Sequence, residues 1–174
     1  MTSHPDAGPF NKGTTLTMSH PNSALIQRFY EAFARRDAEA MSACYTADVR
    51  FSDPVFGELR GDEARDMWRM LTQRAQAFSL TFSDVEANEQ SGGAHWEARY
   101  LFSQTGRTVV NRIEARFVFR DGLIAEHHDT FDLWRWSRQA LGFKGVLLGW
   151  TPFVQRAIRA QARKGLDAYR AKRQ

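Results

Sequence analysis

The sequence predicts an α+β fold, in which N-terminal helices lie against one face of a curved antiparallel sheet. Near the start, apolar residues recur every three or four positions, as on one face of a helix; Leu25, Phe29 and Phe33 share that face. After about residue 76 the apolar period changes to two, which is typical of strands. At 174 residues and 43% hydrophobic composition, the chain suits one compact domain with a substantial core.

The first half of the chain carries three helix signals. Ser23 and Asp37 are suitable N-caps for two helices, and Gly61 precedes the acidic first turn of a third. The elements expected here are helices from Ala24, over 38–45 and over 62–76, with strands at 49–53 and 56–60.

Four strands are expected in the second half, at residues 78–88, 94–104, 107–120 and 123–134, joined by turns at Ser91-Gly92-Gly93, Thr105-Gly106 and Asp121-Gly122. The alternation is clearest in 107–120, where one face is apolar and the other charged, as in an antiparallel sheet covered on one side. The first face holds Val109, Asn111, Ile113, Ala115, Phe117 and Phe119; the second holds Arg112, Glu114, Arg116 and Arg120, with Val118 the exception. Helices on the concave face of such a sheet would form a cone whose mouth can hold a ligand.

The two ends of the chain are interpreted as extensions of a central domain over residues 23–140. Residues 1–22 are an expected disordered extension, because 1–17 are polar and contain two Pro and two Gly. Residues 141–174 are an expected helical extension with Thr151-Pro152 at a helix start. Its stripe of Val154, Ile158, Ala162, Leu166 and Tyr169 predicts packing on its own domain or on a partner subunit. Contact of its basic face with an anionic membrane or nucleic acid is the alternative.

Charge and composition exclude several classes of function. Residues 155–174 carry seven Lys or Arg and one acid, hence +6, so the rest of a chain of net charge +4 is about −2. The folded unit therefore lacks the basic face of a nucleic-acid binder, and no apolar run approaches the roughly 20 residues of a membrane helix. One cysteine permits no internal disulfide, and a reducing cytoplasm is the default location. No zinc-type ligand spacing, phosphate loop or nucleophile elbow is present, so no metal or cofactor is expected.

A carboxylate inside an apolar run is the first candidate for chemistry. Residues 50–61, RFSDPVFGELRG, place Asp53 among Phe51, Val55 and Phe56. In one interpretation Asp53 is an acid/base group in the cone, whose apolar wall raises its pKa. In the other it only caps the backbone before Pro54 at the end of a strand.

The last strand and its neighbours supply the remaining candidates. Asp129 and His127 share a face with Phe131. In one interpretation the carboxylate and the imidazole orient one another inside the cone. In the other they pair at its rim and take no part in chemistry. Trp96 and Tyr100 share a strand face that is either core or a platform for ligand. The candidate ligand-binding residues are Tyr30, Trp96, Tyr100, Asn111 and Phe117.

Two stretches, FYEAFARRDAEAMSACYTADVRFSDPVFGELRG and NRIEARFVFRDGLIAEHHDTFDLW, resemble the nuclear transport factor 2-like superfamily. The chain is most similar to its SnoaL-like branch, whose relatives include ketosteroid isomerases, polyketide cyclases and limonene epoxide hydrolase. The resemblance covers roughly residues 23–140. It implies a cone-shaped α+β barrel, often a homodimer through the sheet.

The resemblance also implies roles for single residues. Asp53 stands where the isomerases carry a general base, while their oxyanion donors would correspond to Phe29 and a position near Ala115. Asp129 stands where the epoxide hydrolase carries its last carboxylate and the cyclases an acid/base Asp. The hydrolase's arginine and its companion Asp would fall near Trp96 and Ala98.

The leading hypothesis is a domain that binds a small hydrophobic molecule and transfers protons through Asp53 and Asp129. His127, Tyr30 and Asn111 would act as hydrogen-bond partners. The alternative is a non-catalytic module for ligand binding or dimerisation, whose cone is filled by side chains and lacks a cavity of the order of 300 Å³. A third hypothesis is that the basic tail docks on an acidic surface.

Overall fold

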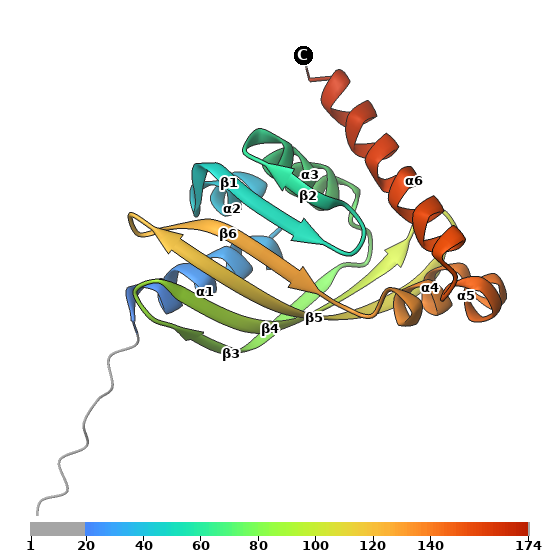
Figure 1. Ribbon diagram of the computed structural model, residues 1–174, viewed down its shortest axis with the longest axis horizontal. Coiled ribbons are helices and arrows are strands. Elements are labelled where there is room, and N and C mark those ends of the chain that lie inside the picture. Colours follow the sequence, from blue (N-terminus) through green and yellow to red (C-terminus); the bar gives the residue numbers. More distant parts are fainter. Residues whose placement is uncertain (1–19, 174) are drawn as a thin grey trace, which may run out of the picture.

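Helices come first and the strands that follow complete one curved sheet, so the predicted α+β class is confirmed (Figure 1). The computed structural model describes residues 20–173. The helices are α1 (Pro21–Ala34), α2 (Ala38–Ala43), α3 (Asp62–Arg74), α4 (Leu133–Leu141), α5 (Phe143–Leu148) and α6 (Pro152–Ala171). The strands are β1 (Tyr45–Asp53), β2 (Gly57–Arg60), β3 (Ser79–Ala87), β4 (Ser91–Phe102), β5 (Arg107–Arg120) and β6 (Leu123–Thr130).

Helix α1 begins three residues earlier than predicted. Its N-cap is His20, whose Nδ1 accepts the backbone N–H of Asn22, and Pro21 occupies the first turn. The predicted cap, Ser23, is instead buried. Two helical residues therefore fall inside the range 1–22 that was expected to be disordered, and residues 1–19 of that range lie outside the described part of the chain.

The sheet contains six strands in the order β2-β1-β6-β5-β4-β3. The expectation of a wholly antiparallel sheet is wrong at its centre, because β1 and β6 pair in parallel with Phe51 opposite His127. Both strands start at the same edge, where Tyr45 pairs with Ile124 just after the hairpin that begins β6. The parallel pairing brings the ends of β1 and β6 together, and with them Asp53 and Asp129.

Two predicted strand boundaries are wrong for local reasons. Asn88 Oδ1 accepts the backbone N–H groups of Gln90 and Ser91, so the turn lies at 88–90 and the predicted turn Ser91-Gly92-Gly93 belongs to β4. Strand β6 ends at Thr130 rather than at residue 134, because Asp132 accepts the backbone N–H of Arg135 and caps α4. The hairpin predicted at Asp121-Gly122 is confirmed, with both residues at positive φ.

Helix α6 packs across α3 along the apolar stripe that the sequence predicts (Figure 1). Leu166 is fully buried, while the basic side of the helix pairs with acids on α3: Arg163 with Glu63 at 2.9 Å and Arg170 with Asp66 at 3.2 Å. The helix thus closes one side of the cone. Within residues 20–173, no helix combines the length and apolarity needed to cross a membrane.

Candidate active-site pocket

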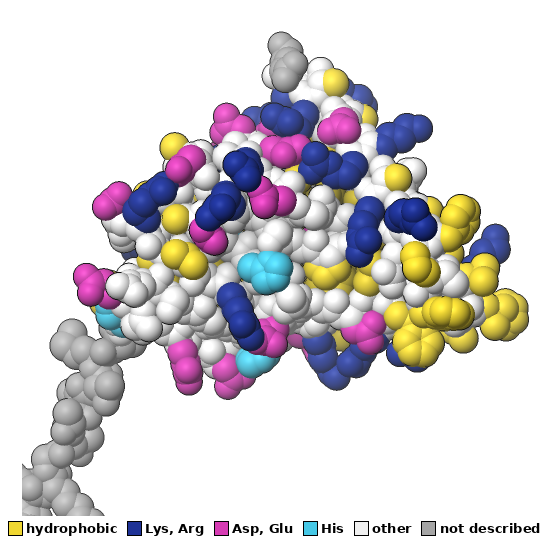
Figure 2. All heavy atoms as spheres, in the orientation of Figure 1, with side chains coloured by type: hydrophobic (Ala, Val, Ile, Leu, Met, Phe, Trp, Pro, Cys, Tyr) yellow, Lys and Arg dark blue, Asp and Glu magenta, His cyan; other side chains and the backbone are white. Residues whose placement is uncertain are grey.

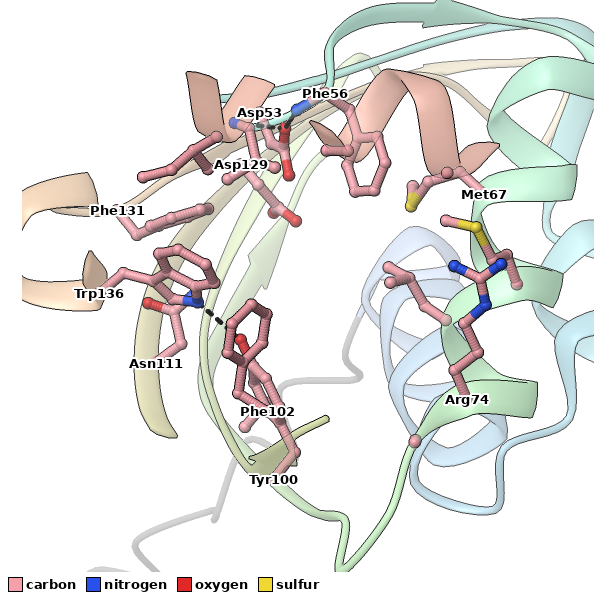
Figure 3. Close-up of a pocket in the computed structure, with 18 of the residues that line it drawn as sticks. Asp53, Phe56, Met67, Arg74, Tyr100, Phe102, Asn111, Asp129, Phe131 and Trp136 are labelled. Atoms are coloured by element: carbon pink, nitrogen blue, oxygen red, sulfur yellow. Dashed lines mark hydrogen bonds between the residues drawn. The ribbon is translucent and has the colours of Figure 1, made fainter. Parts of the chain in front are cut away.

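A cavity of about 480 Å³ opens between the concave face of the sheet, helix α3 and helix α6. This volume exceeds the order of 300 Å³ that a ligand site requires. Its wall is mostly apolar and aromatic, and includes Phe33, Phe51, Val55, Phe56, Met67, Trp68, Phe78, Trp96, Tyr100, Phe102, Phe131, Trp136, Val154 and Ile158. Three charged residues also line it, and Figure 3 shows the carboxylates of Asp53 and Asp129 pointing into the cavity with Arg74 on the opposite side.

Asp53 combines both interpretations that its sequence context allows. Its Oδ1 accepts the backbone N–H groups of Val55, at 2.9 Å, and of Phe56, which closes the turn after β1. The same side chain lines the cavity. Burial raises its pKa to about 7 and the nearby Asp129 carboxylate adds to the rise, although the backbone N–H of Phe56 opposes both. A turn-capping carboxylate is therefore also a group that can gain or lose a proton near neutral pH.

Asp129 is fixed in orientation by two donors. It is 2% exposed, and its Oδ1 accepts from His127 Nε2 at 2.9 Å and from the Trp96 indole N–H at 3.3 Å. With one carboxylate oxygen committed to these donors, the other is available to the cavity that the residue lines. The shared face of His127 and Asp129 on β6 is as predicted.

His127 supports Asp129 from behind and does not line the cavity. Its Nδ1 lies 2.7 Å from the Tyr45 hydroxyl, which itself accepts the indole N–H of Trp68 at 2.9 Å. Because Tyr45 accepts from Trp68, its own hydrogen is free for Nδ1, and Nε2 then carries the hydrogen donated to Asp129. The chain of donors thus runs from Trp68 to the Asp129 carboxylate and selects one imidazole tautomer.

Tyr100 and Asn111, two of the candidate ligand-binding residues, line the cavity. The Tyr100 hydroxyl accepts the indole N–H of Trp136 at 2.8 Å, so its own hydrogen remains available as a donor (Figure 3). Burial raises the pKa of Tyr100, the Trp136 hydrogen bond lowers it and Asp53 raises it, which keeps the hydroxyl protonated at neutral pH. The Asn111 side chain lines the same cavity, and its amide group carries two N–H donors.

Tyr30 and Phe117, which were also expected to contact ligand, lie in the core and do not line the cavity. Tyr30 stacks on Phe82 and meets Phe117 edge-on. Its hydroxyl is buried without a partner among the described residues, and burial raises its pKa well above the ordinary value. The reason for the difference is depth: Tyr30 lies behind Trp96, which lines the cavity, whereas Phe33, three residues further along α1, reaches the open space.

Several pocket residues have no place among the sequence candidates. Arg74 lies seven residues after Met67 on α3, so helical spacing could have placed both on the pocket side. Trp136 of α4 and the α6 residues Val154 and Ile158 carry no such signal, because their position depends on how the C-terminal helices fold back. Among residues 20–173, no three His, Cys, Asp or Glu side chains converge as a metal site would require.

Comparison with known families decides the relationship. The SnoaL-like domain matches residues 26–127, more than half of the chain. This chain belongs to the SnoaL-like domain family. No curated protein matches it in sequence.

Solved structures share this fold. A candidate polyketide cyclase from Xanthomonas campestris pv. campestris is 25% identical, with a TM-score of 0.59, and the match covers 69% of this chain and 96% of that one. A candidate polyketide cyclase from Pseudomonas putida KT2440 is 21% identical, with a TM-score of 0.58 and coverages of 70% and 98%. A limonene-epoxide-hydrolase-like enzyme from M. tuberculosis is 19% identical, with a TM-score of 0.58 and coverages of 77% and 95%.

The structure also shows what occupies the positions where the resemblance implies catalytic groups. Trp96, near the expected place of the epoxide hydrolase arginine, donates to Asp129 in place of a cation. Ala115, near the expected oxyanion Asp, lies directly opposite Asp129 in the β5–β6 register, and Phe29 is fully buried. The polar hydrogen-bonding groups that line the cavity beside the two carboxylates are instead those of Tyr100 and Asn111.

Proposed function

We propose that this SnoaL-like protein is a cofactor-independent acid–base enzyme that moves protons on a hydrophobic small molecule, in an isomerase- or cyclase-type reaction. The observation that supports this most strongly is the pairing of Asp53 and Asp129 in one apolar cavity, with the pKa of Asp53 at about 7. A group with a pKa near the working pH can both accept and return a proton, as general acid–base catalysis requires.

The two carboxylates take different parts in this proposal. Asp53 removes a proton from a carbon next to a carbonyl and returns it to the product. Asp129, held by His127 and Trp96, stays in one orientation and raises the pKa of Asp53 through its charge. Two carboxylates whose environments differ in this way commonly divide the acid and base roles.

Removal of such a proton moves negative charge onto the carbonyl oxygen, which then needs hydrogen-bond donors. The Tyr100 hydroxyl and the Asn111 amide line the same cavity and each has a donor to spare. Tyr100 also lies close enough to Asp53 for that carboxylate to raise its pKa. A ligand whose carbonyl points at Tyr100 would therefore place its neighbouring carbon near Asp53.

The wall of the pocket indicates the class of ligand. Aromatic rings from four parts of the chain, represented by Phe56, Phe78, Trp96 and Trp136, surround a volume of about 480 Å³. A rigid polycyclic ketone fits this combination of size and apolarity. The same class is compatible with the cyclase relatives.

Deuterium exchange tests the proposal without knowledge of the full reaction. The full chain is incubated in D₂O with a panel of polycyclic ketones, and mass spectrometry follows exchange of the hydrogens next to the carbonyl. Wild type is expected to accelerate exchange of at least one ketone over buffer. Asp53→Asn should slow it by about 10²-fold or more, as for loss of a general base. Asp48→Asn, which changes an exposed carboxylate outside the pocket, should leave it unchanged.

Two results would contradict the proposal. If no ketone exchanges faster with protein than in buffer, although fluorescence shows that ketones bind, the protein is a binding module. If exchange survives both Asp53→Asn and Asp129→Asn, the carboxylates are not the acid–base groups.

A further inference from the structure

A cluster of apolar side chains lies on the surface at the end of the molecule formed by α5 and the start of α6. We call it the α5 patch; it consists of Phe143, Val146, Leu147, Leu148, Trp150 and Phe153, each between 47% and 77% exposed. Figure 2 shows hydrophobic side chains gathered at the right-hand end of the molecule, over α5 and the start of α6. Contiguous exposure of this kind marks an interaction surface rather than ordinary surface chemistry.

The packing of α5 against α4 determines which of its side chains face solvent. Within 142–150 only the glycines are buried, and Gly145 and Gly149 lie directly against Ser137 of α4. A Cβ atom at either glycine would overlap Ser137, so α5 can dock only through its glycine side. The helix therefore turns its smallest residues inward and its largest apolar residues to solvent, the reverse of a normal surface helix.

The helices that carry the patch are rich in positive charge. Residues 133–166 contain seven Lys or Arg and no Asp or Glu. Lys144 lies within the patch and is exposed, and Arg138 and Arg156 belong to the neighbouring helices. Figure 2 shows Lys and Arg side chains bordering the hydrophobic cluster. This combination fits a partner that is negatively charged and accepts apolar side chains.

We propose that the α5 patch docks on an anionic lipid surface, with its aromatic and aliphatic side chains inserted among the lipids and the surrounding cations against the headgroups. A short apolar element with flanking Lys and Arg and with tryptophan at its edge is the composition that lies in the plane of a bilayer interface. A second copy of this chain would bring two surfaces of the same positive sign together, which opposes self-association. In the sequence, membrane contact is only the alternative interpretation for the basic face of the C-terminal extension, because α5 is too short to show an amphipathic period of its own.

The patch is continuous with the wall of the pocket. Trp136 and Leu141 of α4 and Val154 and Ile158 of α6 line the cavity, and α5 connects these two helices. Docking at α5 would hold the pocket next to a reservoir of apolar molecules. The proposal does not depend on proton transfer in the pocket, and its test involves no catalytic readout.

Vesicle sedimentation of the full chain tests the patch directly. Wild type is expected to sediment with phosphatidylcholine vesicles that contain phosphatidylserine, and to bind pure phosphatidylcholine at least about tenfold more weakly. The double variant Trp150→Ser/Phe153→Ser, at two highly exposed positions outside the pocket lining, should lose binding by about tenfold or more. Val118→Ser, an exposed apolar residue on β5, is the matched control and should bind as wild type.

Charge variants complete the experiment. Lys144→Gln should weaken binding about fivefold, whereas Lys172→Gln, near the far end of α6, should have a smaller effect. Absence of wild-type binding at low salt would overturn the proposal. So would binding that is indifferent to the patch variants, which would assign it to the basic tail. A dimer in sedimentation equilibrium that Trp150→Ser/Phe153→Ser dissociates, without vesicle binding, would assign the patch to a second copy.

Discussion

Because the pKa of Asp53 is raised, this protein should become less stable as the pH rises. Substitution of Asp53 by asparagine should remove this pH dependence. In Asp53→Asn the side chain is neutral at every pH but still offers an oxygen to the backbone N–H groups of Val55 and Phe56. The turn after β1 should therefore persist. Wild type, in contrast, must hold a charged carboxylate in an apolar wall once the pH exceeds about 7.

The sign and the size follow from the shift. The folded-state pKa is raised from 3.8 to about 7, so the native protein keeps a proton that the unfolded chain has released, and stability falls as the pH rises through this range. Of the interval from pH 5 to pH 8, only the two pH units below the folded-state pKa of about 7 contribute, and they correspond to about 2.7 kcal/mol. Partial exposure of the side chain to solvent reduces this to about 1.5 kcal/mol.

Urea unfolding followed by tryptophan fluorescence at pH 5 and pH 8 measures this difference. The free energy of unfolding of Asp53→Asn relative to wild type should rise by about 1.5 kcal/mol between the two pH values. Asp48→Asn should show no such change, because Arg120 lowers the pKa of Asp48 and it has released its proton below pH 5. An Asp53→Asn difference that is equal at both pH values would show that Asp53 titrates normally and refute the reasoning.

Three further changes test other parts of the structure, each by the free energy of unfolding in urea. His127→Leu leaves Tyr45 and Asp129 without their buried partner and should cost about 3 kcal/mol, whereas His128→Leu on the exposed face should cost under about 0.5 kcal/mol. Gly92→Ala places a Cβ 2.8 Å from the Glu86 carbonyl oxygen and should cost about 2 kcal/mol; at Gly93, with 3.4 Å to the nearest atom, the cost should be smaller. Tyr30→Phe removes a hydroxyl without a protein partner and should be neutral or stabilising by up to about 1 kcal/mol; a large loss would show that the hydroxyl is satisfied.

The fold could be predicted largely because the periodicity is strong where the core forms. The alternation along β5 is found as expected, with Val109, Ile113 and Phe117 buried and Val118 exposed. The parallel pairing of β1 and β6 could not be predicted, because strand direction is set by contacts far apart in sequence. Nor could the turn at 88–90 be placed, since a pair of glycines is a stronger local signal than an Asn that closes a turn with its side chain.

The site was predictable as far as strand alternation determines it. Asp53, Asp129, Trp96, Tyr100 and Asn111 all line the cavity, because each lies on the concave side of a strand. Alternation cannot tell how deep a residue lies along the cone, which is why Phe117 and His127 share the inner side of their strands without reaching the cavity; the helical spacing of α1 has the same limit for Tyr30. The place of Arg74 follows from its helical spacing with Met67, whereas the approach of α6 to the cavity depends on tertiary packing that its apolar stripe alone does not determine.

Helix α6 has a consequence for how this protein can diversify. The family match ends at residue 127, yet Val154, Ile158 and Ala162 form part of the cavity wall. Asp53 lies inside the matched segment and Asp129 two residues after it, whereas one side of the cavity comes from α6, well outside it. If the proposed function holds, exchange of the final helices would change which molecules fit while leaving the carboxylate pair intact, so that ligand range and acid–base chemistry could change separately.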